Sequence, residues 1–204
     1  MNTTKKICIA AAAVALFVCV TFCLQVPVFE NYYLCLGYIV MEVCTFAFGT
    51  VTGVISGSAG VICYCLLTGG LRGMPGWAAG NVIIGLGLGL LFAFIRKTAA
   101  GSTAESAAFD RHAEAGRKAK RILIWAGAAV IITVMTAVGI LGVKSITESL
   151  LYAQPFMVRV LKNMNAFIAD AAVLLAALPL AAVFGPKLRK MTFDRNVKMK
   201  TVRN

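Results

Sequence analysis

Charged residues, and acidic residues above all, are scarce in this sequence. Only 14% of its 204 residues are charged, 8 are Asp or Glu, and the single histidine is His112. These residues offer little material for acid–base catalysis or a metal site, and the chain has no P-loop, His-Glu-x-x-His or Gly-x-Ser-x-Gly motif. We therefore expect no enzyme, no catalytic residue, no metal and no cofactor, and any ATP-driven activity needs another polypeptide.

Apolar residues, in contrast, make up 60% of the chain, and the mean hydropathy is +0.85. A soluble domain normally carries about 25% charged residues, and a membrane-spanning helix needs roughly 20 apolar residues. The sequence predicts an all-α membrane protein, a six-transmembrane-helix bundle that forms a single membrane domain over residues 1–204. The expected helices are about residues 7–26, 34–48, 54–68, 77–95, 122–143 and 166–184.

Polar, Gly-rich and Pro-rich segments separate these helices. We expect loops at 25–33 and 69–76, a tight turn or helix junction at 49–53, a cytoplasmic linker at 98–121, a loop or interfacial helix at 144–162, and a stop at Gly185-Pro186 before a basic cytoplasmic tail at 187–204.

The positive charges predict which ends of the helices face the cytoplasm. With the N-terminus inside, sixteen of the 20 Lys and Arg residues fall on the inner side, as the positive-inside rule requires. Both termini are then cytoplasmic. The net charge of +12 is explained by this anchoring at the ends of apolar runs, so we expect no nucleic-acid partner and a lipid bilayer instead.

Small residues recur at helical spacing. Gly49, Gly53 and Gly57 stand four apart, and Ala11 and Ala15 do the same in the first helix. Such spacing lets helix backbones approach closely in lipid. Packing inside the bundle explains the pattern, and so does sliding of the glycine-rich helices or docking of the first helix onto a partner membrane protein.

The expected outer loops and adjoining helix ends gather groups suited to a small organic ligand. The candidate binding residues are Glu30, Asn31, Tyr32, Arg72, Trp77, Asn81, Asn165 and Asp170. Aromatic rings with a few polar groups at one end of a bundle are typical of a small-molecule pocket, although interfacial anchoring would also explain the aromatic rings. Glu42 and Asp170 fall within apolar helices, where acids are expensive and serve either structure or function.

Between Leu36 and Ile95 the chain resembles a known family. The matching residues are Leu36-Gly37, Phe46-x-Phe48-Gly49, Gly53, Gly57, Gly60, Leu66-Leu67-x-Gly69 and Pro75-x-Trp77. This pattern resembles the substrate-binding S components of energy-coupling factor (ECF) transporters, the vitamin importers of prokaryotes. The sequence departs from the family at Tyr38, where Asp is frequent, and at Thr50, where Pro is frequent.

The resemblance implies a multi-pass protein of the prokaryotic plasma membrane that binds a vitamin or similar micronutrient at the outer face. It implies as partners a transmembrane coupling protein, met by Ala11 and Ala15, and two ATPase subunits. It does not identify the substrate.

Two other functions remain open from the sequence. One is a non-transport six-helix membrane scaffold similar to rod-shape determining proteins, which needs no outer pocket. The other is a small proton-coupled carrier that uses Glu42 and Asp170 as relay groups.

Overall fold

The computed structural model describes residues 3–24, 26–29, 32–104 and 111–201, and within these ranges the fold is almost wholly helical. The elements are α1 (Thr3–Cys23), β1 (Val26–Phe29), β2 (Tyr32–Leu34), α2 (Gly37–Phe48), α3 (Thr50–Thr68), α4 (Met74–Ala104), α5 (Arg111–Ala137), the π-helix η1 (Val138–Lys144), α6 (Ser145–Tyr152) and α7 (Phe156–Thr201).

The described helices confirm an all-α membrane protein. Five helical segments are long and apolar enough to span a bilayer, namely Thr3–Cys23, Thr50–Thr68, Met74–Thr98, Ile122–Tyr152 and Phe156–Thr192, and the apolar helix α2 is shorter. Together they correspond to the six expected helices. Because the helices alternate in direction, the β-hairpin, residues 69–73 and residues 153–155 share one end of the bundle, which we call the hairpin end.

Several expected boundaries are wrong. Residues 26–29 and 32–34 pair as antiparallel strands with an irregularity between Pro27 and Phe29, where we expected a loop. Residues 98–104 and 111–121 are helical, since this Ala-rich polar segment has good helix propensity. Residues 144–162, for which a loop or an interfacial helix was expected, are helical except for the turn at 153–155, and α5 continues through η1 into α6.

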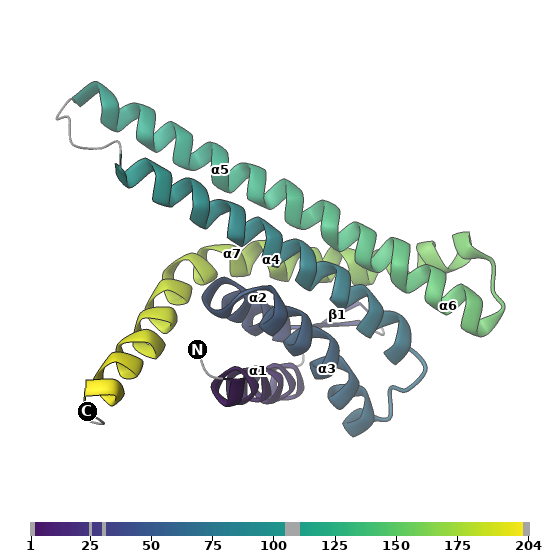
Figure 1. Cartoon of the computed structure of the whole chain (residues 1–204). Helices are drawn as coiled ribbons and strands as arrows, with labels where there is room; N and C mark the ends of the chain where they lie inside the picture. Colours follow the sequence, from purple (N-terminus) through teal and green to yellow (C-terminus); the bar gives the residue numbers. More distant parts are fainter. Residues whose placement is uncertain (1–2, 25, 30–31, 105–110, 202–204) are drawn as a thin grey trace.

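Helix α7 also runs on where a stop was expected. It contains both Pro179 and Pro186 and ends at Thr201. Proline removes one backbone hydrogen bond and bends a helix, and Figure 1 shows α7 bending toward the C-terminus rather than ending. Gly185 lies against α2, where an added Cβ atom would clash with the Phe46 ring.

Close helix packing depends on glycine, as the spacing predicted. Gly49 has φ of 100° and joins α2 directly to α3, a conformation that favours glycine. A Cβ on Gly80 of α4 would lie 2.7 Å from the carbonyl oxygen of Gly139 in η1, and a Cβ on Gly139 would lie 2.8 Å from that of Gly80. The two backbones therefore touch without intervening side chains.

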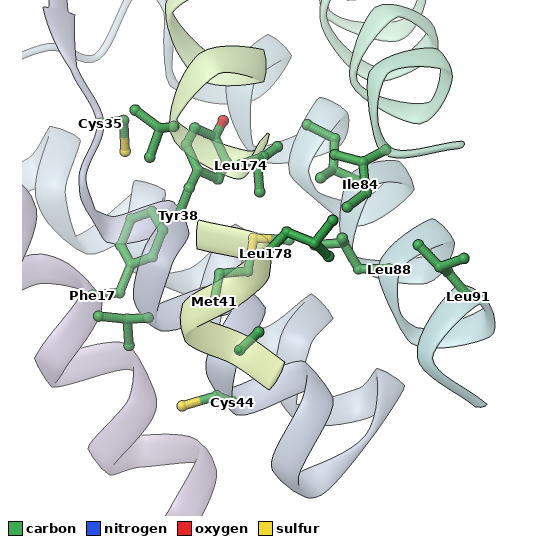
Figure 2. Packing of buried hydrophobic residues seen from close by; sticks show 14 of the residues in the cluster. Phe17, Cys35, Tyr38, Met41, Cys44, Ile84, Leu88, Leu91, Leu174 and Leu178 are labelled. Carbon is green, nitrogen blue, oxygen red and sulfur yellow. The ribbon is translucent and has the colours of Figure 1, made fainter. Parts of the chain in front are cut away.

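Figure 1 shows α4 and α5 as a long pair, with α7 crossing them and α1 beside α3 at the edge. Figure 2 shows the centre, where Met41 of α2, Ile84 and Leu88 of α4, and Leu174 and Leu178 of α7 pack together. Helices α2, α4 and α7 thus form the core, and the polar residues buried beside it are the ones that need explanation.

Candidate functional site

Three polar side chains from two other helices meet at the hydroxyl group of Tyr38, in α2. The Trp77 indole Nε1 donates a hydrogen bond to the Tyr38 hydroxyl oxygen at 2.9 Å, and that hydroxyl donates to Asn81 Oδ1 at 2.7 Å. The same hydroxyl lies 3.3 Å from Asp170 Oδ2. We call Tyr38, Trp77, Asn81 and Asp170 the Tyr38 cluster.

Helix geometry explains why these residues converge. Trp77 and Asn81 are four residues apart on α4 and therefore share a face. Tyr38 is the second residue of α2, which packs against α7, the helix that carries Asp170. Asn81 Nδ2 also donates to the carbonyl oxygen of Gly57 at 3.0 Å, so α3 is tied to the same point. The Tyr38 cluster therefore joins α2, α3, α4 and α7.

Aromatic rings surround the cluster. The Tyr64 ring of α3 meets the Trp77 ring edge to face, with centroids 6.0 Å apart. Phe17 of α1 meets the Tyr38 ring in the same way at 6.2 Å, and Figure 2 shows these two rings next to each other. Such edge-to-face pairs fix the orientation of the rings.

Three of the four residues of the Tyr38 cluster are buried, and Trp77 is partly buried. Tyr38 and Asn81 are 0% exposed and Asp170 is 5% exposed. Asn81 lies seven residues after the start of α4, which is about 10 Å along the helix axis. Buried polar groups at membrane depth are costly and mark functional sites.

A second polar group lies nearer the hairpin end, around Tyr152. The Arg159 guanidinium lies 4.9 Å above the Tyr152 ring and 3.6 Å from Glu148 Oε2, and Arg72 approaches the same ring at 5.7 Å. Asn163 Nδ2 donates to Glu148 Oε2 at 3.1 Å. We call Arg72, Glu148, Tyr152, Arg159 and Asn163 the Tyr152 cluster.

The two clusters follow one another along α7. Asn163 and Asp170 are seven residues apart and both buried, so they occupy the same face of the helix two turns apart. Asn163 Nδ2 also donates a hydrogen bond to the hydroxyl of Ser145 in α6 at 3.0 Å. The two clusters therefore lie along the same face of α7, the Tyr152 cluster nearer the hairpin end.

The structure brings together some of the predicted binding residues. Trp77, Asn81 and Asp170 share the Tyr38 cluster, and Arg72 lies in the Tyr152 cluster. Asn165 is exposed on α7, away from both clusters. The Tyr32 backbone pairs with Phe29 in the hairpin, and Glu30 and Asn31 lie outside the described residues.

Sequence reasoning missed the centre of the site. Tyr38 appeared only as a departure from the family pattern, and Glu148, Tyr152 and Arg159 fell in a segment of undecided structure. One feature of the sequence could have indicated Tyr38. It stands four positions before Glu42 in an otherwise apolar run, and this spacing places two polar residues on one helix face.

Ala11 and Ala15 lie beside the packed face of α1 rather than within it. Both are exposed, whereas Ala10, Ala13, Phe17 and Thr21 are buried. The exposed alanines line an apolar groove of about 1060 Å³ between α1, the α2–α3 junction and α3. Its lining comprises Lys6, Ile7, Ala10, Ala11, Val14, Ala15, Val18, Cys19, Phe48, Thr50, Val51, Thr52, Ile55 and Cys63.

Comparison with known proteins gives one family. The model of the family described as "ECF-type riboflavin transporter, S component" matches residues 1–185, which include both clusters and the groove. No curated protein and no solved structure shows a significant match. The matched family is a family of transporter components rather than of enzymes, and its members are multi-pass proteins of the plasma membrane. The chain belongs to the ECF-type riboflavin transporter S component family.

Proposed function

We propose that this protein captures riboflavin, or a closely related flavin, at the hairpin end of the bundle and passes it inward with a coupling protein and two ATPase subunits. The family membership supports a riboflavin-type substrate. The observation that carries the proposal is the convergence of Trp77 and Asn81 with Asp170 on the Tyr38 hydroxyl.

The chemistry of the Tyr38 cluster suits a flavin. The isoalloxazine ring is flat and aromatic, and one edge presents an N–H between two carbonyl oxygens. Trp77 and Tyr38 offer rings for stacking. The Asn81 amide is both donor and acceptor, and the Asp170 carboxylate accepts hydrogen bonds. Few precisely placed polar groups among apolar walls are what a vitamin-sized ligand requires.

In the structure these polar groups satisfy one another. The Tyr38 hydroxyl is shared among three partners, and Asn81 is fully buried. A ligand that enters from the hairpin end must therefore replace hydrogen bonds within the cluster. Replacing these hydrogen bonds costs little free energy when the ligand re-forms each of them. A molecule without a matching polar edge leaves cluster groups unpaired and therefore binds more weakly.

The proposal for the later steps of transport is supported by the family membership and by the apolar groove. The positive charge pattern supports a cytoplasmic position for both termini, which turns the hairpin end outward. The apolar groove at Ala11 and Ala15 lies nearer the opposite end, beside Lys6 and the α2–α3 junction. We assign the coupling protein to this groove. The two ATPase subunits then act on this chain through the coupling protein.

The alternative functions have less support. A scaffold has no need of polar side chains buried together at one end of the core. A proton-coupled carrier is disfavoured by family membership, because S components depend on a separate energy source.

A riboflavin titration of the purified protein tests the proposal. We expect saturable quenching of riboflavin fluorescence at micromolar concentration or below, without any ATPase. Asn81→Leu removes the bonds to Tyr38 and Gly57 and should weaken binding about 10- to 100-fold. Leu90→Ala, on the exposed face of the same helix, is the matched control and should bind normally. Absence of saturable binding, or normal binding by N81L, would contradict the proposal.

A further inference from the structure

Glu42 is a buried acid that neither polar cluster includes. It lies in α2, is 0% exposed, and among the described residues neither of its carboxyl oxygens has a hydrogen-bond partner. Most buried polar atoms in proteins have such a partner. A fully buried carboxyl group with both oxygens unpartnered therefore requires a specific explanation.

The neighbouring turns of α2 show where Glu42 lies. Tyr38, four residues earlier, bonds to Asn81 of α4 and approaches Asp170 of α7. Phe46, four residues later, packs against Phe92 of α4 at 4.9 Å and against the backbone of α7 at Gly185. Residues four apart occupy one helix face. Glu42 therefore lies between α4 and α7, directly below the Tyr38 cluster when viewed from the hairpin end.

The direction of the side chain adds to this placement. Side chains on an α-helix lean toward its N-terminus, so the Glu42 side chain leans toward the turn that carries Tyr38. The carboxyl group thus lies on the side of the Tyr38 cluster that faces away from the hairpin end.

Burial fixes the chemical form of the group. An ionised carboxylate without a hydrogen bond or a paired cation is too costly at this depth, so Glu42 is a neutral carboxylic acid. In that form it has one O–H donor beside one carbonyl acceptor. Neutral carboxylic acids held in apolar sites serve as hydrogen-bond donors to ligands.

We infer that Glu42 is a ligand-recognition residue, and that its neutral carboxyl group pairs with the N–H and an adjacent carbonyl of the flavin ring. The Glu42 O–H donates to the ring carbonyl and the Glu42 carbonyl accepts from the ring N–H, which gives two parallel hydrogen bonds. This inference rests on the proposed function and assigns Glu42 to the inner end of the same site.

The test compares riboflavin with N3-methylriboflavin, which lacks the ring N–H, on purified protein. Glu42→Gln keeps one donor beside one acceptor and should bind riboflavin within about threefold of wild type. Glu42→Leu removes both and should weaken riboflavin binding about 10- to 100-fold, with a melting temperature equal to or above that of wild type because an unpartnered polar group is gone. Val40→Ala, a buried residue on α2 that is two positions before Glu42 and so on another face of the helix, is the control and should bind normally.

Wild type should bind N3-methylriboflavin about 10- to 100-fold more weakly than riboflavin, and E42L should lose most of this discrimination. Normal riboflavin binding by E42L overturns the inference while leaving the proposed function intact. Absence of riboflavin binding by wild type overturns both. Should E42L fail to fold, equal binding of the two flavins by wild type still overturns the inference.

Discussion

Helices α1 and α4 are similarly apolar and differ sharply in packing. The most apolar window of α1 has 17% of its residues buried, against 56% for α4. Helix α4 packs against α2, α3, α5, α6 and η1 and carries Trp77 and Asn81. Among the described residues, α1 packs mainly against α2 and α3. In lipid, apolar character does not bury a helix, and close contact requires small or polar residues. The comparison separates a central helix that holds the site from a peripheral helix that is open to a partner.

One ring joins the two regions. Phe17 on the buried face of α1 is 0% exposed and meets Tyr38 edge to face. Gly37 and Gly60 make room for it, since a Cβ on either residue would come within 3.0 Å of the Phe17 ring. A change in the position of α1 therefore reaches the Tyr38 cluster directly through the Phe17–Tyr38 contact.

The largest expected effect is the loss of riboflavin uptake when the groove beside α1 is filled. The double variant Ala11→Leu, Ala15→Leu fills the groove and should reduce riboflavin uptake to background in cells that also make the coupling protein and ATPases. Riboflavin binding to the purified protein should not change. Ala12→Leu, which is exposed but does not line the groove, is the control for uptake. Normal uptake by the double variant would refute the assignment of the coupling protein to α1.

The next effect concerns the packing of α4. Gly80→Ala places a Cβ against the backbone of Gly139, which cannot rotate away, and should lower the free energy of unfolding by about 1–3 kcal/mol. Gly127→Ala in α5 meets no atom within 4 Å and serves as the control. Thermal unfolding in detergent measures both variants. A melting temperature for G80A equal to that of G127A would show that the helices do not cross this closely.

A smaller effect is expected at the contact between α1 and the site. Phe17→Leu loses the edge-to-face pair with Tyr38, which is worth about 0.5–1.5 kcal/mol, and should weaken riboflavin binding about two- to tenfold. Leu16→Ala on the exposed face of α1 should bind as wild type does. If F17L binds normally while N81L does not, α1 is uncoupled from the site.

The smallest effect is expected at Arg72, in the Tyr152 cluster near the hairpin end. Arg72 is exposed, and its guanidinium approaches Tyr152 at 5.7 Å. An exposed cation–π contact contributes about 0.5–1 kcal/mol, so Arg72→Ala should change riboflavin affinity by less than about fivefold. If Arg72→Ala lowered riboflavin affinity a hundredfold or more in the same titration, the main binding contacts would lie at the Tyr152 cluster rather than at the Tyr38 cluster.

The sequence predicts helices better than it predicts helix faces. Apolar length located the spans, because it depends on local geometry, and the candidate binding residues at the expected helix ends included Trp77, Asn81 and Asp170. Tyr38 was missed because its partners lie 43 and 132 residues away, and only tertiary packing brings them together. The helical 98–104 and 111–121 segments and the continuation of α7 past Pro186 were missed because polarity and proline were read as breaks, although neighbouring turns sustain the helix.

The structure of the protein bound to riboflavin tests the account most directly. We expect the flavin ring between α2, α4 and α7, with hydrogen bonds to Asn81 and Asp170 that replace those of the Tyr38 hydroxyl. A flavin seated instead against Arg72 and Tyr152, with the Trp77–Tyr38–Asn81 bonds unchanged, would contradict it.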